Sequence, residues 1–363
     1  MARAAAEDTP EPDRRESAPH PREAPALFGH EAGEAEALDA IRSGRLHSGW
    51  LLAGPEGVGK ATFAYRMAGT LLAGERAPGA LGLSPDHPDA RLIRAGSHPR
   101  IFVLRRSLND EGRMRQQIAV EDARALGAFL HLSAPDGGAR AVIVDAADDL
   151  NPASANATLK LLEEPPARTA LLLVAHQPAR LLPTIRSRCR VLRFSPLGPA
   201  DLAAALRAIG VEPEDPGALA ELAGGSVGAA VRLAEEGGLA LYKEVARLAG
   251  TLPRLDRAGA LRLAEGAAGK GDRLSLLLDL LDALLARLAR AGVAGPPPEA
   301  APGEAATLAR LSPHDRAARA WAALQAEAGA RARAGRAVNL DPAGLLLDML
   351  LAIEDTAREA ATA

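Results

Sequence analysis

The sequence has very few of the residues on which several classes of protein depend. Its single cysteine, Cys189, excludes an intrachain disulfide framework and a zinc site built from several cysteines. Aromatic residues make up 2% of the chain, so few side chains offer a surface on which nucleic-acid bases could stack. The sequence has neither an apolar run near the roughly 18 residues of a membrane span nor the pattern of a secretory signal at its beginning. We therefore expect a cytoplasmic protein with no membrane partner.

The charge balance also excludes a general attraction to polyanions. The formal net charge is -3, with 25% charged and 48% hydrophobic residues, which is typical of a soluble globular protein. At 363 residues the chain is long enough for two or three domains with buried cores. Any contact with DNA must therefore be local or shared with partners.

Hydrophobic periodicity divides the chain into a leader, a sheet-forming part and a helical part. Residues 1–24 are rich in Pro, Ala and charges, which predicts a disordered leader. Over residues 25–196, stretches of helical period alternate with short apolar runs. This pattern predicts an α/β domain whose parallel sheet is flanked by helices on both faces. The expected strands are Trp50–Ala53, Ile101–Leu104, Ala141–Val144, Ala170–Ala175 and Val191–Phe194.

After residue 196 the apolar residues follow a helical period only. We expect a small helical lid at 197–238 and a separate all-helical domain at 239–363. In that domain the proline-rich stretch 295–302 is interpreted as a long flexible connection. Asp341 followed by Pro342 predicts the N-cap and first turn of a final helix.

One stretch has the spacing of a phosphate-binding loop. The residues GPEGVGKAT, 54–62, follow an expected strand and precede an expected helix, which is the setting that such loops require. Gly54, Gly57 and Gly59 would let backbone N–H groups surround a phosphate, and Lys60 would supply charge for the outer phosphates. The sequence therefore predicts a site for ATP or ADP and leaves open which of them binds.

Two groups that support hydrolysis are missing beside this loop. Ala61 stands where Ser or Thr normally binds magnesium, and Thr62 is turned about 100° further round the helix. Asp145 ends an apolar run and suits the acid that supports magnesium, but Ala146 stands where a glutamate would activate water. We therefore expect static nucleotide binding, no tight magnesium positioning and no intrinsic ATPase activity.

Several stretches together resemble the clamp-loader branch of the AAA+ ATPases. They are LFGH at 27–30, the phosphate loop, SHP at 97–99, VIVD at 142–145, NATLKLLEEPP at 156–166 and RSRC at 186–189. The resemblance covers roughly residues 26–235 well and the carboxyl-terminal helices weakly, through NLDPAGLLLDML. It implies an AAA+ domain, a helical lid and a helical oligomerisation (collar) domain. It also implies that motor and other related subunits are partners and that the complex meets a sliding clamp and primed DNA.

The resemblance assigns roles to residues at a subunit boundary. In clamp loaders the arginine of Ser-Arg-Cys acts on nucleotide held by the neighbouring subunit, which implies that Arg188 is an arginine finger supplied in trans. The alternative is that Arg188 pairs with a carboxylate of its own domain. Asn156 and Lys160 are implied contacts to an adjacent subunit, and a self-contained polar surface is the alternative for each.

The sequence departs from the pattern of the motor subunits at further places. By resemblance, Ala175 stands where motor subunits have a small polar sensor residue, and Gly228 stands where they have a second sensor arginine. Relatives also carry a four-cysteine insertion. Here His87 and His98 are too few for a zinc site, so we expect no zinc.

Three hypotheses follow. The first is a non-hydrolysing stator of a clamp loader that lends Arg188 to its neighbour. The second is an ATP-hydrolysing motor subunit in which Thr62 and Asp148 take over the missing roles. For Asp148 and Asp149, however, we favour a structural role, in which they cap or solvate the turn before a helix at Asn151. The third, a small-molecule kinase, is disfavoured because a large helical region follows and no substrate lid is visible.

Overall fold

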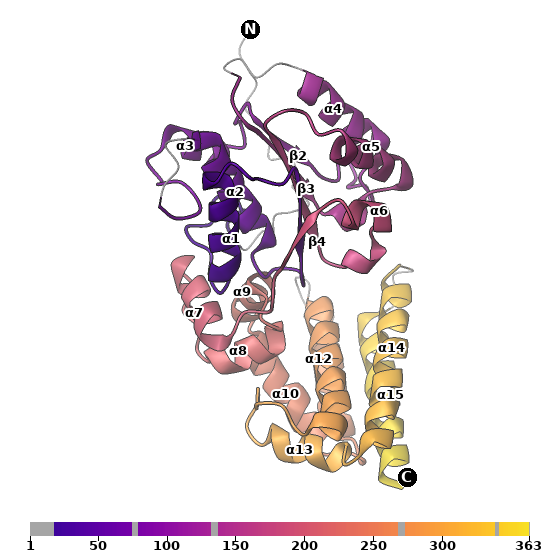
Figure 1. Cartoon of the computed structure of the whole chain (residues 1–363). Coiled ribbons are helices and arrows are strands. Elements are labelled where there is room, and N and C mark those ends of the chain that lie inside the picture. Colours follow the sequence, from indigo (N-terminus) through magenta and orange to yellow (C-terminus); the bar gives the residue numbers. More distant parts are fainter. Residues whose placement is uncertain (1–17, 75–78, 132–136, 268–272, 338–340, 363) are drawn as a thin grey trace. The chain divides into compact units, whose positions relative to one another are not determined.

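A computed structural model describes residues 18–74, 79–131, 137–267, 273–337 and 341–362 (Figure 1). It divides into two compact units, one of residues 1–210 with 226–228 and the other of residues 211–225 with 229–363. This division places residues 197–210 with the sheet. The three-part division at 197 and 239, which the sequence favours, stays a prediction, and residues 1–17 of the expected leader lie outside the described residues.

The first unit alternates strands and helices. Its elements are α1 (Glu31–Arg42), β1 (Gly49–Ala53), α2 (Lys60–Ala73), α3 (Pro88–Arg94), β2 (Ile101–Leu104), α4 (Val120–His131), β3 (Arg140–Asp145), α5 (Pro152–Glu163), β4 (Thr169–Ala175), α6 (Pro183–Arg186), β5 (Arg190–Arg193) and α7 (Pro199–Ala208). Two short 3₁₀ turns, η2 (Ala147–Asp149) and η3 (Pro178–Arg180), follow β3 and β4. All five strands expected from the sequence are confirmed, although β5 begins and ends one residue earlier than expected.

The strands form one parallel sheet in the order β2-β3-β4-β1-β5. Every residue of β1 and β4 is buried, because helices cover both faces of a parallel sheet. Successive residues of a strand point to opposite faces, so Ile143 and Leu172 join one core while Val142 and Leu171 join the other. Figure 1 shows α1, α2 and α3 on one side of the sheet and α4, α5 and α6 on the other.

Local signals explain where α5 begins and ends. The Asn151 side chain accepts a hydrogen bond of 2.8 Å from the backbone N–H of Ser154, and Pro152 occupies the first helical position. The helix ends at Glu163 because the residue before a proline disfavours helical geometry, and two prolines follow at 165 and 166. This placement fixes the ends of the exposed face that α5 presents.

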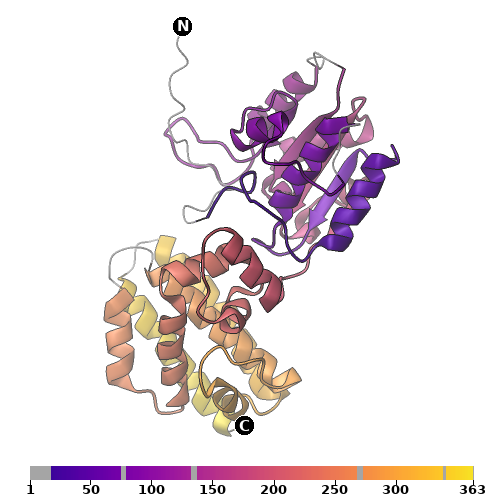
Figure 2. The ribbon, with the colours of Figure 1, turned by 90° about the vertical axis from the view of Figure 1, so that its left-hand side faces the viewer.

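The second unit is helical throughout its described elements. They are α8 (Pro216–Ala223), α9 (Val227–Glu235, whose first two residues count with the first unit), α10 (Gly238–Gly250), α11 (Arg257–Ala267), α12 (Arg273–Ala294), α13 (Glu304–Leu311), α14 (Asp315–Ala337) and α15 (Pro342–Thr362). The long helices α12, α14 and α15 run side by side in both views (Figure 1 and Figure 2). The expected cap of α15 is confirmed, since Asp341 accepts a hydrogen bond from the N–H of Gly344 at 2.7 Å.

The proline-rich stretch 295–302 is not a loose connection, contrary to the expectation from its composition. The buried Arg287 donates to Glu304 at 2.7 Å and to the carbonyl oxygen of Pro298 at 2.5 Å. Glu304 also accepts hydrogen bonds from the Tyr242 hydroxyl at 2.5 Å and from the N–H of Ala300 at 2.7 Å. The buried ion pair of Arg287 and Glu304 thus holds the stretch in place through its backbone. Composition alone does not reveal these contacts.

Of the helices in the described ranges, none combines the length and the apolar character that crossing a membrane requires.

Candidate functional site

The phosphate loop connects β1 to α2 in a shape that glycine makes accessible. A side chain at Gly54 would lie 2.2 Å from the carbonyl oxygen of Phe194, so the close approach of these two backbones requires glycine. Gly59 has φ of +100° and precedes the first residue of α2. His30 supports the loop from outside, since its Nε2 donates to the carbonyl oxygen of Val58 at 2.7 Å. The amino terminus of α2 therefore presents uncapped N–H groups, which suit an anion.

Lys60 opens helix α2 and is almost completely buried, with 2% of its surface exposed. Its ammonium group donates to the carbonyl oxygens of Gly54, at 2.7 Å, and of Pro55. Burial lowers the pKa of Lys60 to about 8, and the nearby negative charge of Asp145 opposes this effect in part. The lysine thus carries a charge near neutral pH whose hydrogen bonds go to two neutral carbonyl oxygens of the loop, so an incoming phosphate would be a stronger partner.

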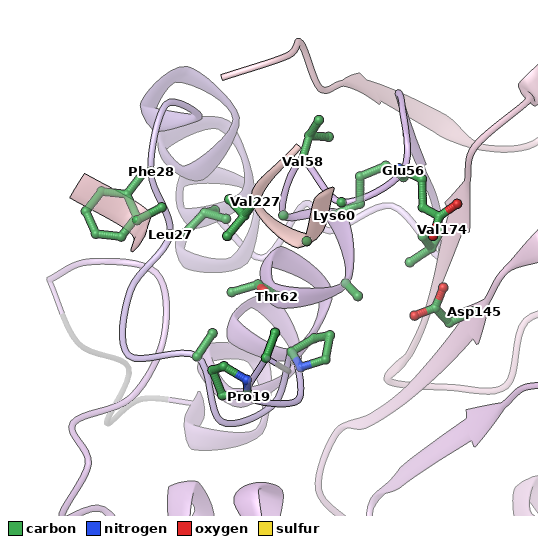
Figure 3. Close-up of a pocket in the computed structure, with 18 of the residues that line it drawn as sticks. Pro19, Leu27, Phe28, Glu56, Val58, Lys60, Thr62, Asp145, Val174 and Val227 are labelled. Atoms are coloured by element: carbon green, nitrogen blue, oxygen red, sulfur yellow. The ribbon is translucent and has the colours of Figure 1, made fainter. Parts of the chain in front are cut away.

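A cavity of about 360 Å³ lies beside the loop, wholly within the first unit. Six of the predicted site residues line it: Gly57, Gly59, Lys60, Ala61, Thr62 and Asp145. Figure 3 shows Lys60 and Thr62 from α2 and Asp145 from β3 around it. Gly54 lies outside the lining and acts through the loop's shape. A cavity of this volume beside a phosphate loop and apolar side chains such as Leu27 and Val227 suits a nucleotide.

Alanine stands at the two cavity positions where a hydrolysing site would have a magnesium-binding hydroxyl and a water-activating carboxylate. Both Ala61 and Ala146 line it. Asp148, the substitute considered above, accepts hydrogen bonds from the backbone N–H groups of His176 and, at 3.2 Å, of Gln177. Asp149 pairs with Arg106 at 3.1 Å, and burial raises the pKa of its carboxyl group. Both acids thus have structural partners.

His176 is a residue of this cavity that the sequence did not indicate. The resemblance placed a sensor position at Ala175, but Ala175 is fully buried in β4 and is not part of the lining, whereas His176 is. His176 Nδ1 is buried and has no hydrogen-bond partner among the described residues. Burial and the positive charge of Lys60 lower its pKa, so the ring is neutral at pH 7. The sequence feature that could have identified His176 is its position directly after a strand, because ligands of such sheets bind at the carboxyl ends of the strands.

Two further walls of the cavity come from segments outside the strands. Gly228, where the resemblance expects a motor subunit's arginine, lines the cavity without offering a charge. Residues 18–24, expected within the disordered leader, have defined positions, and Pro19 and Pro21 line the cavity. His20 is fully buried, with its ring edge-on to Tyr65 at 5.8 Å.

The other predicted residues lie on the surface of the first unit, away from the cavity lining. Asn156 and Lys160 are exposed on α5, four residues apart and therefore on one face of the helix. The Arg188 guanidinium lies at the end of that face and forms an ion pair of 2.9 Å with Glu163. In the single chain, Arg188 therefore pairs with a carboxylate of its own domain, which is the alternative that the sequence left open.

The remaining candidates for metal or thiol chemistry have structural partners. His87 caps α3 by accepting from the N–H of Asp89 at 3.2 Å, and His98 lies 3.3 Å from the same aspartate. Within the described ranges, no group of three or more His, Cys, Asp or Glu side chains could hold a metal ion. Cys189 is partly buried, and burial raises the pKa of its thiol to about 12, which makes it unreactive.

The fold and this cavity define a class of protein. A parallel sheet in the order β2-β3-β4-β1-β5, a phosphate loop after β1 and an acid at the end of β3 together have the fold of an AAA+ P-loop domain. The fold class expected from the sequence is confirmed, namely a P-loop α/β domain followed by a helical region.

Comparison with known proteins shows which proteins this chain is similar to. Residues 34–198 match the model of the family described as DNA polymerase III, delta subunit. The DNA polymerase III subunit delta' of Pseudomonas aeruginosa is 40% identical over 193 residues, or 52% of this chain and 56% of that protein. The subunit delta' of Yersinia pestis is 40% identical over 147 residues, or 40% of this chain and 41% of that protein. The DNA polymerase III subunit gamma/tau of Mycobacterium tuberculosis is 28% identical over 200 residues, or 51% of this chain and 31% of that protein.

The resemblance to clamp-loader subunits that the sequence predicts is confirmed, since residues 34–198 match this family of DNA polymerase III subunits and the relatives are similar over about half of the chain. The chain spans about half the length of the delta' relatives that it matches.

Proposed function

We propose that this chain functions as the delta prime subunit of a bacterial clamp loader. In this role it is a non-hydrolysing stator that holds a nucleotide, supplies Arg188 in trans as an arginine finger and helps to load the sliding clamp on primed DNA during DNA replication. The match of residues 34–198 to the family model and the similarity to the delta' subunits support this assignment. The stator role and the finger are our inferences from the site.

The observation that carries the proposal is the pair of alanines in the nucleotide cavity. Ala61 and Ala146 both line it, at the positions of the magnesium ligand and of the water-activating acid. Lys60, the loop N–H groups and Asp145 remain, so the chain keeps the parts that bind phosphate. We propose that it holds ATP or ADP statically, with little demand for magnesium and none for zinc.

The surface residues supply the second half of the proposal. The side chain of Arg188 is 39% exposed, so a nucleotide on an adjacent subunit could reach it. Asn156 and Lys160, on the exposed face of α5 that ends beside Arg188, would contact that subunit. A guanidinium can contact two phosphate oxygens at once and spread its charge over them, which is the chemistry of an arginine finger.

The proposed partners follow from the family. They are the ATP-hydrolysing gamma/tau subunits and the delta subunit of the DNA polymerase III holoenzyme, with the sliding clamp and primed DNA reached through the complex. The similarity of the gamma/tau subunit supports an association with related chains. Such a complex works in the cytoplasm. We propose no nucleotidyl-transfer role for this chain.

The alternative of an ATP-hydrolysing motor subunit has less support from the geometry. It needs Asp148 to activate water, but Asp148 does not line the cavity, and its Oδ2 accepts hydrogen bonds from two backbone N–H groups just after β4. It also needs Thr62 to replace the hydroxyl missing at position 61. Neighbouring residues of a helix point about 100° apart, so the Thr62 hydroxyl does not take the place of a hydroxyl at that position.

The test is ATP turnover by the purified chain. We expect it to bind ATP, to return it intact over many hours, and to lose binding when Lys60 is replaced by Ala. Steady hydrolysis that disappears in Lys60→Ala would contradict the stator proposal and favour the motor alternative. Circular dichroism of Lys60→Ala checks that the variant is folded, so that a loss of binding can be assigned to the site and not to unfolding.

A further inference from the structure

Both terminal nitrogens of the Arg188 guanidinium are engaged with its own domain. Arg188 Nη2 lies 2.9 Å from Oε1 of Glu163, and Nη1 donates to the carbonyl oxygen of Thr184 at 3.1 Å. These nitrogens are the ones that a finger would turn toward a phosphate. The proposed finger is therefore folded back in the free chain and must leave two partners before it can act.

The position of Glu163 makes it more than a chance neighbour. It is the last residue of α5, and it follows Lys160 by three residues and Asn156 by seven, so the three side chains share one exposed face. A carboxylate at the carboxyl end of a helix is unfavourable because the helix dipole is negative there. The positive charge of Arg188 offsets both the carboxylate and the helix end, so the chain itself favours the folded-back position.

We infer that Glu163 is a positioning residue for Arg188, which it holds against α5 until a nucleoside triphosphate on the neighbouring subunit takes the guanidinium over. This inference rests on the proposed role of Arg188 in trans. The Glu163 carboxylate and the terminal phosphate compete for the same two nitrogens. When the neighbour loses its terminal phosphate, Arg188 returns to Glu163 and the contact between the subunits weakens.

The exposure of the pair indicates that it biases Arg188 without locking it. The two side chains are 39% and 42% exposed, and an ion pair in such a position changes an equilibrium by about fivefold at most. A triphosphate offers more negative charge and two oxygens in the geometry that a guanidinium prefers, so it wins the competition. The ion pair between Arg188 and Glu163 thus raises the ATP concentration needed for half-maximal activity and leaves the rate at saturating ATP unchanged.

The experiment is steady-state ATPase kinetics of the reconstituted clamp loader with clamp and primed DNA, in which this chain carries Glu163→Gln. Removing the competing charge should lower the KM for ATP about two- to fivefold and leave kcat unchanged. Added salt should shrink this difference, because exposed charges are screened. Glu164→Gln is the matched control, since Glu164 is also exposed and carries the same charge one residue further on. It should leave KM unchanged.

Combining the variants separates this inference from the proposed function. In an Arg188→Ala background, Glu163→Gln should have no further effect, whereas a merely structural role of Glu163 would persist there. If Arg188→Ala leaves the ATPase unchanged, the proposed finger is wrong. If Arg188→Ala lowers the ATPase but Glu163→Gln leaves KM at its wild-type value or lowers kcat, the finger stands and the positioning role of Glu163 is overturned.

Discussion

Raising the pH from 7 to 9 should weaken nucleotide binding through Lys60. This ammonium group is buried, and burial lowers its pKa to about 8 in the free chain, well below the ordinary 10.5. Below pH 8 the group is charged and attracts a phosphate. Above pH 8 it is neutral, and the chain must take up a proton before the charge can form.

The size of the effect follows from the protonated fraction. With a pKa of about 8, roughly nine tenths of the chains carry the charge at pH 7 and roughly one tenth at pH 9. The apparent affinity scales with the competent fraction, so binding should weaken about tenfold. His176 contributes nothing in this range, because its pKa is lowered from an ordinary value of 6.5.

The assay is titration of the purified chain with magnesium-free ATP or ADP by calorimetry at pH 7, 8 and 9, in buffers of different ionisation enthalpy. Near pH 9 each binding event should take up nearly one proton. Lys60→Met keeps the length of the side chain but carries no charge, so its weaker binding should be independent of pH. An affinity for the wild-type chain that is equal at pH 7 and pH 9 would refute this reasoning.

Two further predictions concern stability and reactivity. Glu304→Gln should destabilise the helical unit by about 3 kcal/mol, because it leaves the buried Arg287 without its closest carboxylate. Urea unfolding followed by the fluorescence of the buried Trp321, in a Trp50→Phe background, measures this, and an unchanged midpoint would contradict it. Cys189, whose thiol pKa burial raises to about 12, should react with an aromatic disulfide reagent about a thousandfold more slowly at pH 8 than in denaturant. Equal rates would show that the thiol is accessible and ionised in the folded chain.

Local patterns in the sequence were sufficient for the sheet and the loop. Buried strands appear as short runs of Val, Ile, Leu and Ala, and all five runs become strands. The phosphate loop depends on glycine spacing within nine residues, and the start of α5 depends on Asn151 and Pro152 alone. Each of these features is decided by neighbours in the chain, so a single sequence contains the information.

The features that were missed depend on contacts between distant residues. Arg188 meets Glu163 across 25 positions of sequence, from RSRC to LLEEPP, and no periodicity links them. His176 lines the cavity as the first residue after β4, whereas Ala175, the last residue of that strand, is buried in the sheet. The proline-rich stretch 295–302 has the composition of a flexible connection, and only the buried Arg287 shows that it is fixed.

The most direct test of the central claim is the ATPase rate of the gamma/tau subunits, reconstituted with delta, clamp, primed DNA and this chain as wild type or Arg188→Ala. Arg186→Ala is the matched control, since Arg186 is exposed two residues earlier, and gel filtration verifies assembly. We predict that Arg188→Ala lowers hydrolysis at the neighbouring site by about a thousandfold, as the loss of an arginine finger does, while Arg186→Ala does not. An unchanged rate in an intact Arg188→Ala complex would contradict the claim that this chain acts on its neighbour's nucleotide.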